Sequence, residues 1–174
     1  TFRDGDELVQ TPAGVAHYLE HKMFDLPEGN AMQQFAATGA SPNAFTSYAM
    51  TAYYFDCTDR FEENLRLLLH FVTTPYFTQE SVEKERSIIA QEIRMYEDSA
   101  GSACFEQLAQ AMYAHHPLRV PIAGTVESIQ AITPELLYRC HASFYDPANL
   151  MLCVVGDVSP QRICDLAAAL MPQH

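Results

Sequence analysis

The feature of this sequence that most constrains its fold is a change in hydrophobic period near residue 40. Apolar residues recur at mostly helical spacing over residues 13–24, whereas aromatic and β-branched residues over 43–46 and 51–57 flank a short polar turn. Helical spacing then returns over residues 61–72 and 79–96. The sequence therefore predicts a β-hairpin that is preceded and followed by helices.

Start and stop signals place further boundaries along the chain. Thr11 followed by Pro12 predicts the N-cap and first turn of the first helix, and Asn30 predicts the cap of a short helix that ends before Gly39. Additional helices are expected over residues 103–114, over residues 134–145 and from Pro160 onward.

The apolar run from Leu150 to Gly156 has the composition of a strand that is buried on both faces. A hairpin, several helices and a late strand together favour the α+β class, with an antiparallel or mixed sheet layered with helices. A length of 174 residues, of which 48% are hydrophobic, suits one folding unit with a sizeable core.

Charge and cysteine usage narrow the possible partners and location. Ten Lys and Arg against 22 Asp and Glu leave a net charge of −12, which repels nucleic acid and anionic membrane surfaces. The longest apolar runs also fall short of the roughly 18 residues that a membrane span needs. Five cysteines without C-x-x-C spacing indicate free thiols in a reducing compartment, and hence a cytoplasmic location.

The segment from His17 to His21 contains the residue types that bind metal ions. On a helix, His17 and His21 lie one turn apart, about 40° around the axis, and Glu20 shares their face. Two imidazoles at this spacing can hold a zinc ion, and a carboxylate beside them can reach a water molecule at the metal. An ordinary solvated helix face is the alternative until a third ligand is found.

Two carboxylates in the long predicted helix are candidates for that third ligand. Glu85 and Glu92 are seven residues apart and so lie two turns apart along one stripe. Isoleucines surround Glu92 in the sequence, which is unusual for a wet helix face. Spacing alone leaves both possibilities open for Glu92, a ligand and a solvated charge.

Several segments of this chain resemble one known family. They are Gly14 to Phe24, Ser41 to Ser47, Glu85 to Glu92, His116 to Gly124, and Phe144 to Asp157. Together they resemble the inverzincin family of zinc metallopeptidases, also called the pitrilysin or insulinase family, whose motif is H-x-x-E-H. The likeness covers nearly the whole chain and is strongest to bacterial members of unassigned substrate.

The resemblance implies the roles of the residues in a zinc site. His17, His21 and Glu92 would bind one zinc ion, with a fourth position left for water, and Glu85 would orient a metal-binding histidine. Glu20 would be the general base that takes a proton from the water and delivers it to the leaving amine.

The resemblance also implies how substrate is bound. Asn43, Ala44 and Phe45 would form an edge strand that pairs with an extended peptide, and Phe24 would line the pocket beside the metal. An ordinary inner strand is the alternative for this segment. The expected activity is zinc-dependent endopeptidase cleavage of small or unfolded polypeptides.

Members of this family are clamshells of several homologous domains. We therefore expect residues 1–174 to be a single zinc-binding peptidase domain from a longer chain, completed by a homologous second half or a partner subunit. That other half would supply an Arg and a Tyr, so the isolated domain would be weakly active or inactive. Two alternatives are a non-catalytic scaffold subunit and a zinc-stabilised interaction module, although structural zinc sites usually fill all four positions.

Overall fold

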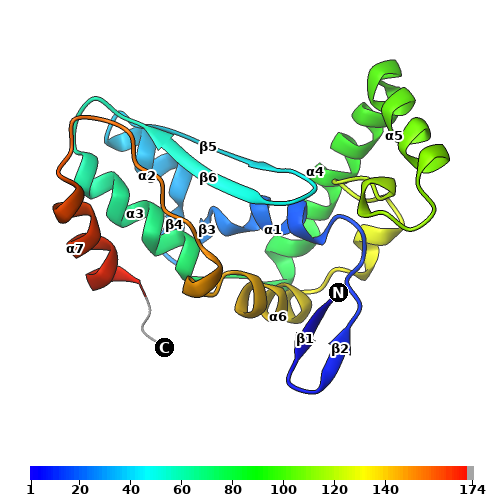
Figure 1. Cartoon of the computed structure of the whole chain (residues 1–174), viewed down its shortest axis with the longest axis horizontal. Helices are drawn as coiled ribbons and strands as arrows, with labels where there is room; N and C mark the ends of the chain where they lie inside the picture. The colour runs from blue at the N-terminus through cyan, green and yellow to red at the C-terminus, as the bar shows by residue number, and fades with distance from the viewer. Residues whose placement is uncertain (172–174) are drawn as a thin grey trace.

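A computed structural model describes residues 1–171, which form seven α-helices and six short strands (Figure 1). The helices are α1 (Val15–Met23), α2 (Ala31–Ala37), α3 (Phe61–Thr73), α4 (Gln79–Asp98), α5 (Ala100–Met112), α6 (Pro134–Phe144) and α7 (Pro160–Leu170). The strands are β1 (Phe2–Asp4), β2 (Glu7–Val9), β3 (Asp25–Leu26), β4 (Gly29–Asn30), β5 (Ser41–Thr46) and β6 (Thr51–Asp56). None of the helices in residues 1–171 is long and apolar enough to cross a membrane.

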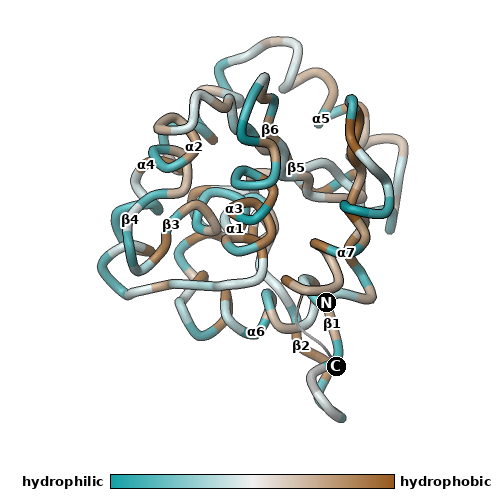
Figure 2. Tube along the Cα trace, turned by 90° about the vertical axis from the view of Figure 1, so that its left-hand side faces the viewer, coloured by the Kyte–Doolittle hydropathy of each residue, from teal (hydrophilic) through white to brown (hydrophobic). Residues whose placement is uncertain are grey.

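The strands form three antiparallel pairs, β1 with β2, β3 with β4 and β5 with β6. The predicted hairpin is the longest of them, with a register that runs from Ser41 opposite Asp56 to Thr46 opposite Thr51. Helices α1 and α2 pack against β5, and α1 lies near the middle of the molecule in both views (Figures 1 and 2). The α+β class with antiparallel sheets and helices is therefore confirmed.

The start of α1 differs from the sequence prediction. Gly14, not Thr11, is the N-cap, and it adopts a left-handed conformation with φ of 89° that favours glycine. The helix therefore begins three residues later than expected. The prediction for α2 is confirmed, because the Asn30 side chain accepts a hydrogen bond from the Met32 backbone N–H at 2.9 Å.

The segment from Leu150 to Gly156 is not the buried strand that its composition predicted. It pairs with none of the described strands, and Met151 and Val155 are 92% and 94% exposed. An apolar run forms a strand only where a neighbouring strand offers backbone hydrogen bonds. Within residues 1–171 no strand lies in that position.

The core joins α1 to α4 and so determines which residues face each other. Tyr18 and Leu19 of α1 are buried in the same hydrophobic cluster as Ile89 and Ile93 of α4. The Tyr18 hydroxyl also donates a hydrogen bond to the carbonyl oxygen of Val82 in α4. This packing brings the polar face of α1 against the face of α4 that carries Glu85 and Glu92.

A second contact places residues 121–125 against the start of α1. Gly14 and Gly124 both have positive φ, and a Cβ atom on either would overlap the backbone of the facing segment. The Ser128 hydroxyl strengthens the contact by donating to the carbonyl oxygen of Ala13 at 2.9 Å. The two glycines therefore permit an approach that any side chain would prevent.

Replacing Gly124 by Ala is expected to lower the free energy of unfolding by about 2–5 kcal/mol. This figure adds the cost of a left-handed conformation at an alanine to the cost of the overlap between its Cβ and Ala13. Gly39 is a matched control, because its φ of 76° is close to the 75° of Gly124 and a Cβ there meets nothing within 4 Å. Gly39→Ala should cost only about 1–2 kcal/mol. Denaturant unfolding measures both, and equal losses would contradict the close-approach role of Gly124.

Candidate metal centre

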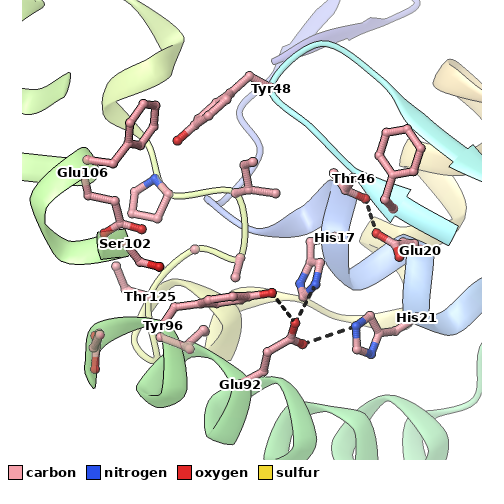
Figure 3. Close-up of a pocket in the computed structure, with 18 of the residues that line it drawn as sticks. His17, Glu20, His21, Thr46, Tyr48, Glu92, Tyr96, Ser102, Glu106 and Thr125 are labelled. Carbon is pink, nitrogen blue, oxygen red and sulfur yellow. Dashed lines mark hydrogen bonds and ion pairs between the residues drawn. The ribbon is translucent and has the colours of Figure 1, made fainter. Parts of the chain in front are cut away.

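The centre is built on one face of α1. His17 and His21 lie one turn apart with ring centroids separated by 4.6 Å. Their Nε2 atoms both face Glu92 of α4, where His17 lies 3.5 Å from Oε1 and His21 lies 3.4 Å from Oε2 (Figure 3). Two helices thus bring three side chains to one point.

These three residues are the group of described side chains that could hold a metal ion. One ligand atom from each of His17, His21 and Glu92 lies within 4.8 Å of the others. Two imidazole nitrogens and one carboxylate oxygen form a donor set that suits zinc and leaves a position for a further ligand. The residues present therefore fit the metal.

The electrostatics of His17 support a ligand role. Burial lowers the pKa of His17, against the opposing effect of the Glu92 charge; the neighbouring His21 lowers it further. A low pKa keeps the imidazole neutral, which is the form that offers a lone pair to a metal.

Glu85 forms a hydrogen bond with the second histidine. Its Oε1 accepts a hydrogen bond from Nδ1 of His21 at 3.0 Å, so the Nε2 of that ring is left to face Glu92. The hydrogen bond with Glu85 raises the pKa of His21, although burial acts in the opposite direction. Burial alone would raise the pKa of Glu85, but the hydrogen bond and charge of His21 and the charges of Lys22 and Lys84 lower it. This is the usual arrangement by which a carboxylate selects the tautomer of a metal-binding imidazole.

Glu20 lies beside the ligand group but is not part of it. Its side chain is largely buried, and its Oε2 accepts a hydrogen bond from the hydroxyl of Thr46 at the end of β5 (Figure 3). The Thr46 hydroxyl also lies 3.2 Å from that of Thr51, its partner across the hairpin. The hairpin thus holds one oxygen of Glu20, a contact that sequence reasoning missed.

Tyr96 is a second residue that sequence reasoning missed. Its hydroxyl donates a hydrogen bond to Oε1 of Glu92 at 2.9 Å and points into the centre (Figure 3). Tyr96 follows Glu92 by four residues in α4 and therefore shares its face. This i, i+4 spacing is the signal that could have identified it.

A cavity of about 760 Å³ opens over these residues. Its walls come from α1, β5, α4, α5 and residues 121–125, and Ala44, Phe45 and Thr46 line it from β5. Phe24 does not line this cavity, contrary to the expectation. Phe24 follows α1 as its C-cap and is buried in the core, because its ring packs against Phe71 and Tyr53, with centroid distances of 5.1 and 5.9 Å.

Strand β5 has the one-sided pairing of an edge strand. It hydrogen-bonds to β6 alone among the described strands, so its other edge has no strand partner there. Burial alternates along β5, with Asn43 and Phe45 on the exposed side and Ala44 half-buried. Asn43 lies outside the lining of the cavity, which its neighbours Ala44 and Phe45 reach.

Comparison with protein families finds two matches. Residues 9–126 match the family described as insulinase, peptidase family M16. Residues 131–173 match the family described as the peptidase M16 inactive domain.

Curated relatives of this chain include bacterial proteins named as uncharacterized zinc proteases. YmfH of Bacillus subtilis is 49% identical over 158 residues, which are 91% of this chain and 37% of that protein. ML0855 of Mycobacterium leprae is 31% identical over 94% of this chain and 37% of that protein. The chain thus spans less than two fifths of the length of either relative.

Solved structures share the fold. A protein from Alicyclobacillus acidocaldarius described as an M16-like peptidase has a TM-score of 0.91 and 43% identity, covering 97% of this chain and 40% of that one. A protease from Helicobacter pylori has a TM-score of 0.85 and 25% identity, and the match covers 97% of this chain and 43% of that protease. A peptidase M16 inactive domain from Pseudomonas fluorescens has a TM-score of 0.82 and 22% identity, and the match covers 99% of this chain and 44% of that domain. At this identity the likeness shows a shared fold and nothing more.

Proposed function

The chain belongs to the insulinase family of peptidases, family M16, and from this premise we propose that it is the zinc-binding domain of a zinc endopeptidase. The observation that carries the proposal is the convergence of two histidine Nε2 atoms on both oxygens of Glu92, with Glu20 beside them. His17, His21 and Glu92 would hold the metal. Zinc, when bound, supplies a Lewis acid that polarises a peptide carbonyl and lowers the pKa of water to about 7.

Glu20 is the general base in this proposal. Its Oε2 is held by the Thr46 hydroxyl, so Oε1 remains to take a proton from the attacking water. The same oxygen then delivers the proton to the nitrogen of the leaving amine. The partly buried position of Glu20 keeps that carboxylate out of bulk water and close to the reacting groups.

The unpaired edge of β5 is the proposed substrate site. An extended peptide that adds to this edge would form main-chain hydrogen bonds with residues 43–45, whatever its side chains are. Only a polypeptide with accessible backbone can bind in this way, so small or unfolded polypeptides are the proposed substrates.

The whole protein is proposed to need a second part. The chain covers 40% of the Alicyclobacillus structure, which leaves room for a homologous half that closes over the cavity. We expect residues 1–174 alone to cleave peptides feebly. The alternative of a non-catalytic scaffold subunit shares the fold, but a retained ligand group and general base favour the enzyme.

Assays on the full-length protein test the proposed function. A library of internally quenched peptides should be cleaved, a zinc chelator should abolish cleavage, and added zinc should restore it. A scaffold subunit would show no cleavage under any of these conditions, and a structural zinc module would bind zinc without cleaving.

Replacing Thr46 by Val is expected to lower kcat about 10-fold in the full-length enzyme with little change in KM, because Glu20 loses the hydroxyl that holds its Oε2. Thr46→Ser keeps a hydroxyl and should recover most of the rate. Steady-state kinetics and zinc content measure the effect. A kcat for Thr46→Val within twofold of the wild type would contradict this role.

A further inference from the structure

A charged side chain lies in the core directly after the second histidine. Lys22 of α1 is 1% exposed and ranks among the largest fully buried side chains of the described residues. Burying an ammonium group costs several kcal/mol unless opposite charges and acceptors surround it. The contacts of Lys22 therefore identify what this charge does.

Two hydrogen-bond acceptors and one further carboxylate surround the Lys22 ammonium. Nζ donates to Oδ2 of Asp25 and to the backbone carbonyl oxygen of Ser81 at 3.3 Å, and it lies 4.0 Å from Oε2 of Glu85. Asp25 is itself held by the Asn30 side chain, whose Nδ2 lies 3.4 Å from Oδ1. Lys22 thus joins β3 and α4 to the helix that carries both histidines.

The two oxygens of Glu85 have different partners. Oε1 accepts from Nδ1 of His21 at 3.0 Å, whereas Oε2 faces the Lys22 ammonium. The attraction between a positive charge and one oxygen of a carboxylate opposes rotation of the carboxylate away from that charge. Lys22, Glu85 and His21 therefore form a continuous series that ends at the Nε2 facing Glu92.

Resting on the proposed zinc site, we propose that Lys22 is a positioning residue that holds Glu85 in the orientation directing His21 toward the metal. The ammonium fixes Oε2 of Glu85, so that Oε1 stays opposite Nδ1 of His21. The buried charge thereby orients a ligand without touching the metal or the substrate.

A purely structural role for Lys22 makes a different prediction. In that case Lys22 ties α1 to α4 through the Ser81 carbonyl, and its loss lowers stability without acting through Glu85. The two roles are separated by whether the effect of Lys22 on zinc affinity depends on Glu85.

The test measures zinc affinity by competition with a chromophoric chelator in the full-length protein. Lys22→Met should weaken zinc binding about 10-fold, and Glu85→Gln about 10-fold to 100-fold, as substitutions beyond the ligands typically do. The double variant should bind no more than about twofold weaker than Glu85→Gln alone, since removing Glu85 leaves Lys22 nothing to position. Arg94→Met is the control for loss of a positive charge on α4, because Arg94 is exposed, and it should leave the affinity unchanged.

Proton–nitrogen correlation spectra of the metal-free protein give an independent signature. In the wild type the ring proton of His21 should be on Nδ1, and in Lys22→Met the Nδ1–H signal should broaden or be partly lost. A structural role would change the unfolding temperature but leave this signal in the folded protein. Lys22→Gln, which keeps a donor for Ser81, replaces Lys22→Met if that variant does not fold.

The outcomes distinguish this inference from the proposed function. Wild-type protein that binds no zinc would reject the zinc site itself. Wild-type binding together with unchanged affinity in the folded Lys22 variant, or with losses that add in the double variant, would reject the role of Lys22 alone. Loss of affinity that disappears in the Glu85→Gln background supports it.

Discussion

Replacing Glu20 by Gln is expected to leave zinc bound and to slow peptide cleavage by the full-length enzyme about 10²-fold to 10⁴-fold. The amide has nearly the shape of the carboxylate and can still accept from the Thr46 hydroxyl, but it cannot take a proton from water. Because Glu20 is not in the ligand group, metal content should stay at the wild-type level. Kinetics and metal analysis on the same preparation measure both quantities.

The matched control for Glu20 is a carboxylate in the same cavity. Glu97 lines the cavity from α4 and is exposed, so Glu97→Gln should stay within a few-fold of wild-type activity. If Glu20→Gln is as active as Glu97→Gln, the proposed mechanism is wrong. If zinc is lost together with activity, Glu20 has a structural role in the centre instead.

The second large effect concerns the ligands. The folded protein should hold about one zinc ion per chain, and His17→Ala or Glu92→Ala should weaken binding by more than about 100-fold, beyond the loss typical of residues outside the ligand group. Each substitution removes one of three donor atoms that lie within 4.8 Å of one another. Metal analysis after dialysis, with competition titration, measures the change.

His115 is the control for an effect of histidine loss in general. It is exposed and lies outside the ligand group, so His115→Ala should retain full zinc. Stoichiometric zinc in both ligand variants would overturn the assignment of the centre.

The part of the centre on α1 could be predicted from the sequence because it is local. Residues 17, 20 and 21 lie within two turns, and the period of a helix places them on one face whatever the rest of the chain does. The same holds for the β5–β6 hairpin, whose alternating pattern and polar turn lie within 16 residues, since 56 − 41 + 1 = 16.

Spacing in the sequence could not decide which α4 residues belong to the metal centre. Spacing along the stripe of Glu85 and Glu92 left two possibilities open for Glu92, a ligand and a solvated charge, and only the element packed against α4 distinguishes them. Burial of Ile89 and Ile93 against α1 turns that stripe toward the histidines. The family resemblance implied roles for both residues, whereas this packing is the physical reason that they lie near the histidines.

Other assignments depended on contacts that no local pattern contains. The family resemblance implied that Phe24 lines the pocket, but Phe24 is buried in the core, where it packs against Phe71. Sequence reasoning did not single out Lys22, whose ammonium lies beside Asp25 and Glu85 in the structure. In each case the deciding partner comes from another element.

The sequence by itself determined the helices, the hairpin and the H-x-x-E-H face, because these depend on backbone periods and on neighbours within a few residues. Only the tertiary structure decided that Glu92 meets both histidines, which precede it by 75 and 71 residues (92 − 17 and 92 − 21). It also decided that residues 150–156 form no strand and leave most of their side chains exposed, since a strand needs a partner strand as well as an apolar composition. Contacts between distant segments follow from how whole faces pack, and periodicity along one segment carries no information about its partner.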